Sequence, residues 1–138
     1  MIDEQNLKGT VVMMHPEMWE AHADKEGVIG EIVKADPVRD DFYVKYDGGA
    51  EPRLHSADAL MVLREPDEIY EYLQNHSADI SPYDFKDLKR IALLTDRSTV
   101  KQMRTAMELV EKNENIREAS ATTLDKIIGL RQSKGVDR

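Results

Sequence analysis

The sequence contains no cysteine and few aromatic residues, with one Trp, two Phe and five Tyr among 138 residues. Without cysteine, the chain can form neither a disulfide framework nor a thiolate nucleophile. No apolar run approaches the roughly 20 residues that a membrane-spanning helix needs. The first residues, MIDEQNLKG, lack the basic and apolar segments of a secretory signal. These absences predict a cytoplasmic protein that does not contact a membrane.

Catalytic and ligand-binding motifs are also missing. The chain has no G-x-S-x-G, P-loop, G-x-G-x-x-G or H-E-x-x-H pattern. His15 and His22 share one polar stretch with several acids, but their spacing matches no zinc or calcium site. Asp40 and Asp41 form either a carboxylate pair or plain solvated charge at a turn. We therefore expect no enzyme activity, no metal and no cofactor.

The composition is that of a globular protein, with 41% hydrophobic and 33% charged residues. The formal net charge of −8 is unevenly distributed along the chain. Residues 1–66 hold 7 Lys/Arg and 14 Asp/Glu, whereas residues 86–138 hold 12 and 8. Because nucleic-acid affinity rests on neutralising phosphates, the acidic first half is a poor nucleic-acid surface. A basic surface, if there is one, belongs to the second half.

Turn signals and alternating apolar residues predict five short strands, over residues 9–14, 27–36, 42–46, 53–55 and 60–64. In the second of these, Gly30 indicates a bend or a close approach of backbones. In the third, Phe42, Val44 and Tyr46 share one face, and Tyr43 lies on the other. These faces distinguish core residues from an outward-facing aromatic.

The order of these elements resembles a known fold. The chain contains, in order, a strand, a long loop, the pattern G-x-x-G-x-I, an aromatic strand, a D-G-G turn, a short strand, a compact turn and an apolar strand. This order is similar to that of SH3-like barrels of the Tudor and KOW type. The resemblance implies a small SH3-like β-barrel over residues 1–66, a fold that serves many unrelated functions.

From Asp67 onward, apolar residues recur at helical spacing instead. Asp67, Ser81 and Thr99 are capping residues at helix starts, and a last helix runs from about Asn115 to Gly129. The stripe expected to be buried after Ser81 comprises Phe85, Leu88, Ile91 and Ala92. The predicted fold class is therefore α+β, with the barrel followed by a three-helix region over residues 67–138. The short linker at residues 65–67 predicts that this region packs on the barrel.

The aromatic residues indicate where a partner would bind. The resemblance to Tudor-like barrels implies that aromatics of the first long loop and the third strand form a cage for a cation. Trp19 and Tyr43, with Tyr46 as a further candidate and Asp41 or Asp47 beside them, match this arrangement in residue type. The alternative is that Trp19 closes one end of the barrel as part of the core. The hypothesis places a site for a basic segment of another protein on Trp19, Asp41, Tyr43 and Asp47.

The second half offers an alternative surface. A loose basic set spans two predicted helices and comprises Lys86, Arg90, Arg97, Lys101 and Arg104. These helices do not match a DNA-binding helix-turn-helix, because Gln102 stands where that motif needs an apolar residue. The alternative is a salt-bridged solvent face.

The predicted function is a non-enzymatic adaptor or regulatory accessory protein that binds another protein through the barrel loops. The alternative is a nucleic-acid-associated accessory protein of transcription or translation that uses the basic face.

Overall fold

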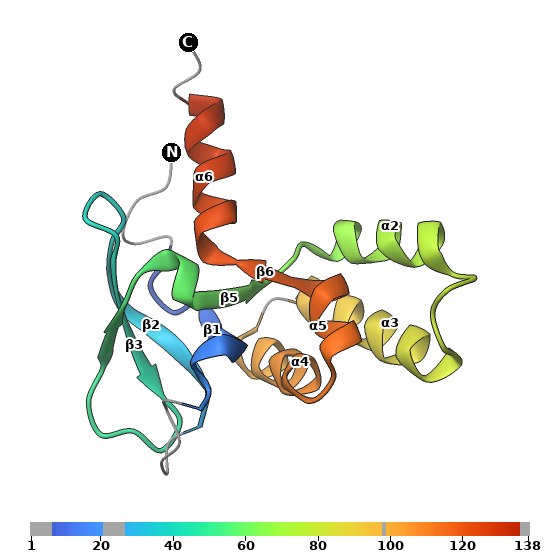
Figure 1. Cartoon of the computed structure of the whole chain (residues 1–138), viewed down its shortest axis with the longest axis horizontal. Helices are drawn as coiled ribbons and strands as arrows, with labels where there is room; N and C mark the ends of the chain where they lie inside the picture. The colour runs from blue at the N-terminus through green and yellow to red at the C-terminus, as the bar shows by residue number, and fades with distance from the viewer. Residues whose placement is uncertain (1–6, 21–26, 98, 136–138) are drawn as a thin grey trace. The chain divides into compact units, whose positions relative to one another are not determined.

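Figure 1 shows the computed structural model of the chain, which describes residues 7–20, 27–97 and 99–135. The strands are β1 (Val11–Met14), β2 (Ile29–Asp36), β3 (Asp41–Tyr46), β4 (Arg53–His55), β5 (Leu60–Leu63) and β6 (Ala121–Thr123). The α-helices are α2 (Pro66–His76), α3 (Pro82–Arg97), α4 (Val100–Lys112), α5 (Glu114–Ser120) and α6 (Leu124–Gly135). Two single 3-10 turns, η1 (Pro16–Met18) and η2 (Ala57–Ala59), follow β1 and β4. The five predicted strands are confirmed, with ends shifted by at most two residues.

The strands form one sheet in the order β4-β3-β2-β1-β5-β6. The pairs β1–β2, β1–β5, β2–β3 and β3–β4 are antiparallel. Within the described residues, β4 and β6 end this order without pairing with each other, so the sheet is open and the predicted closed barrel is not confirmed. Both edge strands have three residues. So short a strand offers few backbone groups for the pairing by which a barrel closes.

The chain divides into two compact units, which differ from the predicted division at residues 66 and 67. The sheet unit holds residues 1–62 and 123–138, and the helical unit holds residues 63–122. Helix α6 therefore belongs with the sheet. The reason is that Leu124 and Ile128, one helical turn apart, are buried in the core of the sheet unit. Figure 1 shows α6 rising from the sheet beside the turn that precedes β5.

One face of the sheet carries the core of the sheet unit. Phe42, Val44 and Tyr46 of β3 are each at most 2% exposed and belong to this core. Tyr43, between them, lies on the opposite face because successive side chains of a strand alternate. The predicted division of β3 into a core face and an outer face is confirmed.

Gly30 lies where β2 passes very close to β3. A Cβ at this position would lie 2.4 Å from the carbonyl oxygen of Lys45 and 2.9 Å from the Cα of Tyr46. Both neighbours are backbone atoms, which cannot move aside as a flexible side chain does. The close approach predicted at Gly30 is confirmed.

Each helix of the helical unit buries one apolar stripe. The buried residues are Ile69 and Leu73 of α2, Leu88, Ile91 and Ala92 of α3, Ala106, Met107 and Val110 of α4, and Ile116 and Ala119 of α5. None of the helices within the described ranges combines the length and apolarity needed to cross a membrane.

The capping residues predicted for α3 and α4 are confirmed. The Ser81 hydroxyl accepts a hydrogen bond from the Asp84 N–H at 3.1 Å, and the Thr99 hydroxyl accepts one from the Gln102 N–H at 3.2 Å. The cap of α2 is Glu65 rather than Asp67. Pro66 takes the first helical position, where its missing N–H costs no hydrogen bond, and this moves the helix start ahead of Asp67.

The described residues contain five α-helices, whereas the sequence marks four helix starts and predicts a three-helix region. The four predicted starts each mark a separate helix, and β6 divides the last predicted helix into α5 and α6. The Ser120 hydroxyl donates to the Ile116 carbonyl at 2.6 Å, and Ala121 is extended, with φ −134° and ψ 159°. Thr122 and Thr123 follow, and β-branched side chains favour a strand over a helix.

We predict that Gly30→Ala lowers the free energy of unfolding by about 2 kcal/mol or more, because backbone must shift to admit the methyl group. Gly129→Ala in α6 is the matched control, since its added Cβ has no atom within 4 Å apart from its chain neighbours and the backbone of its own helix. That substitution should raise stability by roughly 0.5–1 kcal/mol, the gain of alanine over glycine in a helix. Urea denaturation followed by circular dichroism measures both, and a Gly30→Ala protein as stable as the parent would contradict the close approach.

Candidate docking groove

The structure places Trp19 against the core of the sheet unit. Its half-buried ring packs on the buried cluster that includes Phe42 and Tyr46. The indole Nε1–H donates to the Met14 carbonyl oxygen at 2.7 Å, so the polar group of the ring is satisfied. This environment favours a packing role for Trp19.

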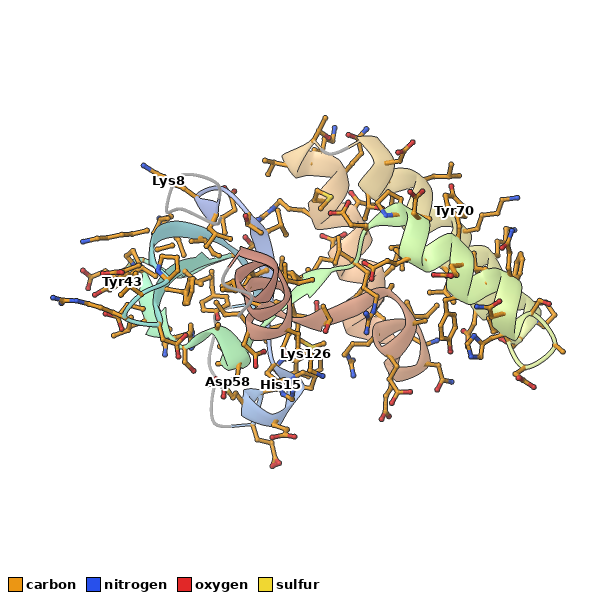
Figure 2. All side chains as sticks on the ribbon, turned by 90° about the horizontal axis from the view of Figure 1, so that it is seen from above. Lys8, His15, Tyr43, Asp58, Tyr70 and Lys126 are labelled. Atoms are coloured by element: carbon orange, nitrogen blue, oxygen red, sulfur yellow. The ribbon has the colours of Figure 1, made fainter. Side chains whose placement is uncertain are left out.

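Tyr43, labelled in Figure 2, lies on the outer face of the sheet. Its neighbours across the ladder are Lys34 of β2 and Leu54 of β4. The Lys34 ammonium lies 5.7 Å from the centroid of the Tyr43 ring, within cation–π range. The cation over Tyr43 therefore comes from the chain itself.

Asp41 and Asp47 lie near opposite ends of β3. Six residue steps of extended chain separate them, which corresponds to about 20 Å. Asp41 pairs with Asp36 at the end of the β2–β3 hairpin, whereas Asp47 follows the last residue of β3. The structure therefore does not bring all four residues of the hypothesis together: Trp19 packs on the core, whereas Asp41 and Tyr43 share the outer face of β3 and Asp47 lies a strand length from Asp41.

The predicted basic set is divided between two helices. Lys86 and Arg90 are exposed on α3, one helical turn apart. Lys101 is exposed in the first turn of α4, and Arg104 is half-buried. The side chain of Arg97 lies outside the described part of the chain. The exposed cations therefore gather chiefly on α3.

An apolar hollow opens between α2 and α3, the two neighbouring helices at the start of the helical unit (Figure 1). Its volume is about 340 Å³, and its lining residues are Tyr70, Leu73, Gln74, Ser77, Phe85 and Lys89. We name it the α2–α3 groove. Figure 2 labels Tyr70 on α2. The lining follows from helical spacing, because successive members on each helix are one, three or four residues apart and share one side of that helix.

Apolar side chains remain open to solvent in the groove and beyond it. Phe85 is 36% exposed, and Leu93, about two turns further along α3, is 51% exposed. Lys89 lies between them at four-residue intervals, so the three residues form one stripe along the helix. This exposed stripe is distinct from the buried face of α3.

Phe85 was expected in the buried stripe of α3, and this expectation is wrong. Leu88, Ile91 and Ala92 are at most 1% exposed. Phe85 lies in the first turn of the helix, at the edge of this buried stripe. Sequence reasoning also missed Tyr70 and Lys89. Leu93 was a usable signal for this surface: it is apolar, lies about 100° around the helix from Ala92 and does not belong to the predicted buried stripe.

The other flank of α2 is acidic. Two further hollows, of about 360 Å³ and 180 Å³, share Tyr72 and Glu118 in their linings. The acids around them are Glu68, Glu71, Asp79, Asp84 and Glu118. The rings of Tyr72 and His76 stack there, with centroids 4.2 Å apart. The helical unit thus presents an acidic flank and an apolar flank on either side of α2.

No group of three or more His, Asp or Glu side chains in residues 7–20, 27–97 and 99–135 is arranged to hold a metal ion. His22 lies outside those ranges. The His15 Nδ1 accepts from the Glu17 N–H at 3.1 Å, a local contact at the start of η1. The Asp40 carboxylate accepts from the Ala57 N–H at 2.9 Å and so ties the β2–β3 turn to η2. Asp40 therefore has a structural role.

Comparison with models of protein families, with curated proteins and with solved structures finds no match to the chain. The features that bear on function are those of the chain itself. They are the α2–α3 groove, the cations beside it on α3, and the outer face of the sheet around Tyr43.

We predict that Trp19→Ala lowers the free energy of unfolding by about 3 kcal/mol, because the ring packs on the core. Tyr43→Ala should cost about 1 kcal/mol or less, the range for one cross-strand contact. Trp19→Phe keeps most of the packing and should cost about 1 kcal/mol for the lost hydrogen bond. Chemical denaturation measures all three. If Trp19→Ala and Tyr43→Ala lower the free energy of unfolding by the same small amount, Trp19 is a candidate contact residue and not part of the core.

Proposed function

We propose that the protein is a non-enzymatic accessory protein that binds another protein through the α2–α3 groove. One observation carries the proposal: Tyr70, Leu73 and Phe85 line a hollow of about 340 Å³ that leaves apolar surface in contact with water. Water in contact with apolar surface raises the free energy of the unbound protein. A partner that covers the groove removes this contact, which is why exposed apolar patches mark binding sites.

The residue types of the groove support a protein as the partner. Tyr and Phe are enriched at the centres of protein interfaces, and Gln74, Ser77 and Lys89 supply the polar edge that such centres have. The apolar surface also extends past the groove to Leu93. Small-molecule sites instead enclose most of their ligand in one concave space.

The sheet unit contributes less to the proposal. Of the residues predicted to bind a basic segment, Trp19 packs on the core of that unit, whereas Asp41 and Tyr43 share the outer face of β3 and Asp47 follows its last residue. Tyr43 and the exposed Leu54 remain a smaller candidate contact on the outer face of the sheet.

We also propose that the sheet unit is an open variant of the SH3-like barrel. Three features support this proposal: the strand order β4-β3-β2-β1-β5, the 3-10 turn before β5, and the antiparallel pairing of β5 with β1. SH3-like folds host unrelated functions, so the proposed binding role does not depend on it.

Nucleic-acid association through α3 is a second candidate function. The observation that favours it is the exposure of Lys86, Lys89 and Arg90 on adjoining turns of one helix. Phosphate contacts release counterions, so affinity for a short duplex would fall steeply as salt rises. A salt titration of duplex binding separates the two functions, and the primary proposal expects no binding at physiological salt.

We predict that a photoreactive amino acid in place of Gln74 crosslinks to a protein in intact cells, because Gln74 is exposed at the edge of the groove. Asn75 is the matched control. It is the next residue on α2 and is also exposed, but it lines the acidic hollow instead. Mass spectrometry of the crosslinked products identifies the class of macromolecule.

Phe85→Ala in the Gln74 variant should reduce the crosslink several-fold, because it removes the largest exposed apolar side chain of the groove. Equal crosslinking from positions 74 and 75, or no crosslinked protein from position 74, would show that the groove is not the binding site.

A further inference from the structure

We infer that the segment bound in the α2–α3 groove is an amphipathic helix that carries acidic residues beside its apolar face. The inference rests on the proposed function, since it names the partner chemistry of the same groove. Two observations carry it: the shape of the exposed apolar stripe, and the sign of the charges along that stripe.

The stripe has the form of a helix-binding surface. Phe85, Lys89 and Leu93 follow one line along α3, and the eight residue steps from Phe85 to Leu93 span about 12 Å. Tyr70 and Leu73 of α2 form the opposite wall of the groove. A helix with apolar residues at i, i+3 or i+4 and i+7 covers the same length, and such helices commonly bind in grooves between two helices.

The exposed charges at the Phe85 end of the stripe are positive. Lys86, Lys89 and Arg90 are exposed around Phe85, although the whole chain has a net charge of −8. The exposed acids of the two helices are Asp67, Glu68 and Glu71 on α2 and Asp96 on α3. Glu68 and Glu71 line the acidic hollow on the other flank of α2, and Asp96 lies about one turn beyond Leu93, so the positive charge is concentrated at the Phe85 end of the stripe. Charge complementarity therefore selects an anionic partner and opposes a cationic one.

Other occupants would fit part of this surface. A second copy of the chain could place its acidic flank of α2 against these cations, and a nucleic acid could place phosphates there. Neither accounts for both features, because the acidic flank supplies little apolar surface and phosphates supply none. The experiment below separates all three.

The test is a selection of helical peptides on the full-length protein. The peptides are about 16 residues long, with leucine fixed at helical spacing and Glu, Lys, Gln and Ala equally allowed elsewhere. We expect the retained peptides to contain more Glu than Lys. The affinity of a retained peptide is then measured by fluorescence anisotropy.

Substitutions locate the binding surface. The double substitution Lys86→Glu, Lys89→Glu should lower the affinity for the retained peptide about tenfold, because two attractive charge interactions become repulsive. Lys126→Glu, at an exposed position on α6, is the control and should change nothing. Phe85→Ala should also weaken binding by about tenfold. Because that change can disturb α3, Leu93→Ser at a 51% exposed position provides a second variant, with folding checked by circular dichroism.

Several results would overturn the inference. They are retained peptides without an excess of Glu, an affinity unaffected by Lys86→Glu and Lys89→Glu, or no retained peptide at all. If the full-length protein binds a single-stranded or duplex oligonucleotide more tightly than it binds the retained peptide, the cations of α3 form a nucleic-acid site instead. Self-association of the purified protein that Phe85→Ala abolishes would assign the groove to a second copy.

Failure of the inference and failure of the proposed function are distinguishable. If no acidic peptide is retained but Gln74 crosslinks a protein in cells, the function stands and the partner chemistry is wrong. If Gln74 crosslinks no protein, the proposed function is wrong whatever the peptides do.

Discussion

Burial of one apolar stripe per helix holds the helical unit together, and the same burial decides what the unit presents to solvent. Leu73 of α2 and Leu88 and Ile91 of α3 are buried. A helix can turn only part of its circumference toward its neighbours, so apolar side chains outside that part stay at the surface. Phe85 and Leu93 are such side chains on α3. The α2–α3 groove is the place where this unburied apolar surface meets a hollow, and the cations of α3 border it.

The sheet unit solves a different burial problem. Its sheet is open over the described residues, so the strands alone do not enclose the apolar face that Phe42, Val44 and Tyr46 form. The first turns of α6 contribute Leu124 and Ile128 to that core. Helix α6 therefore takes over part of the cover that closure would give a barrel, which explains why residues 123–138 group with the sheet.

Local signals were sufficient to predict the strands and most helix starts, because a capping hydroxyl such as that of Ser81 or Thr99 acts within three residues. Strand β6 could not be predicted in this way, because the backbone partner at its start, the Arg64 N–H that donates to the Ser120 carbonyl at 2.8 Å, comes from a distant part of the sequence. The binding hypothesis grouped Trp19 with Tyr43 in one site because both are aromatic. Which way a loop tryptophan turns depends on tertiary packing, and here it packs on the core.

The central claim is that a partner covers the α2–α3 groove and the exposed stripe that continues from it to Leu93, and cysteine footprinting tests it most directly because the chain has no cysteine of its own. Leu93→Cys and Asn75→Cys each introduce a single thiol at an exposed position of the helical unit. In the purified protein, a maleimide should label both at similar rates. In intact cells at the native level of expression, the account predicts that Leu93→Cys is labelled several-fold more slowly than Asn75→Cys. Equal labelling of the two positions in the cell would contradict it.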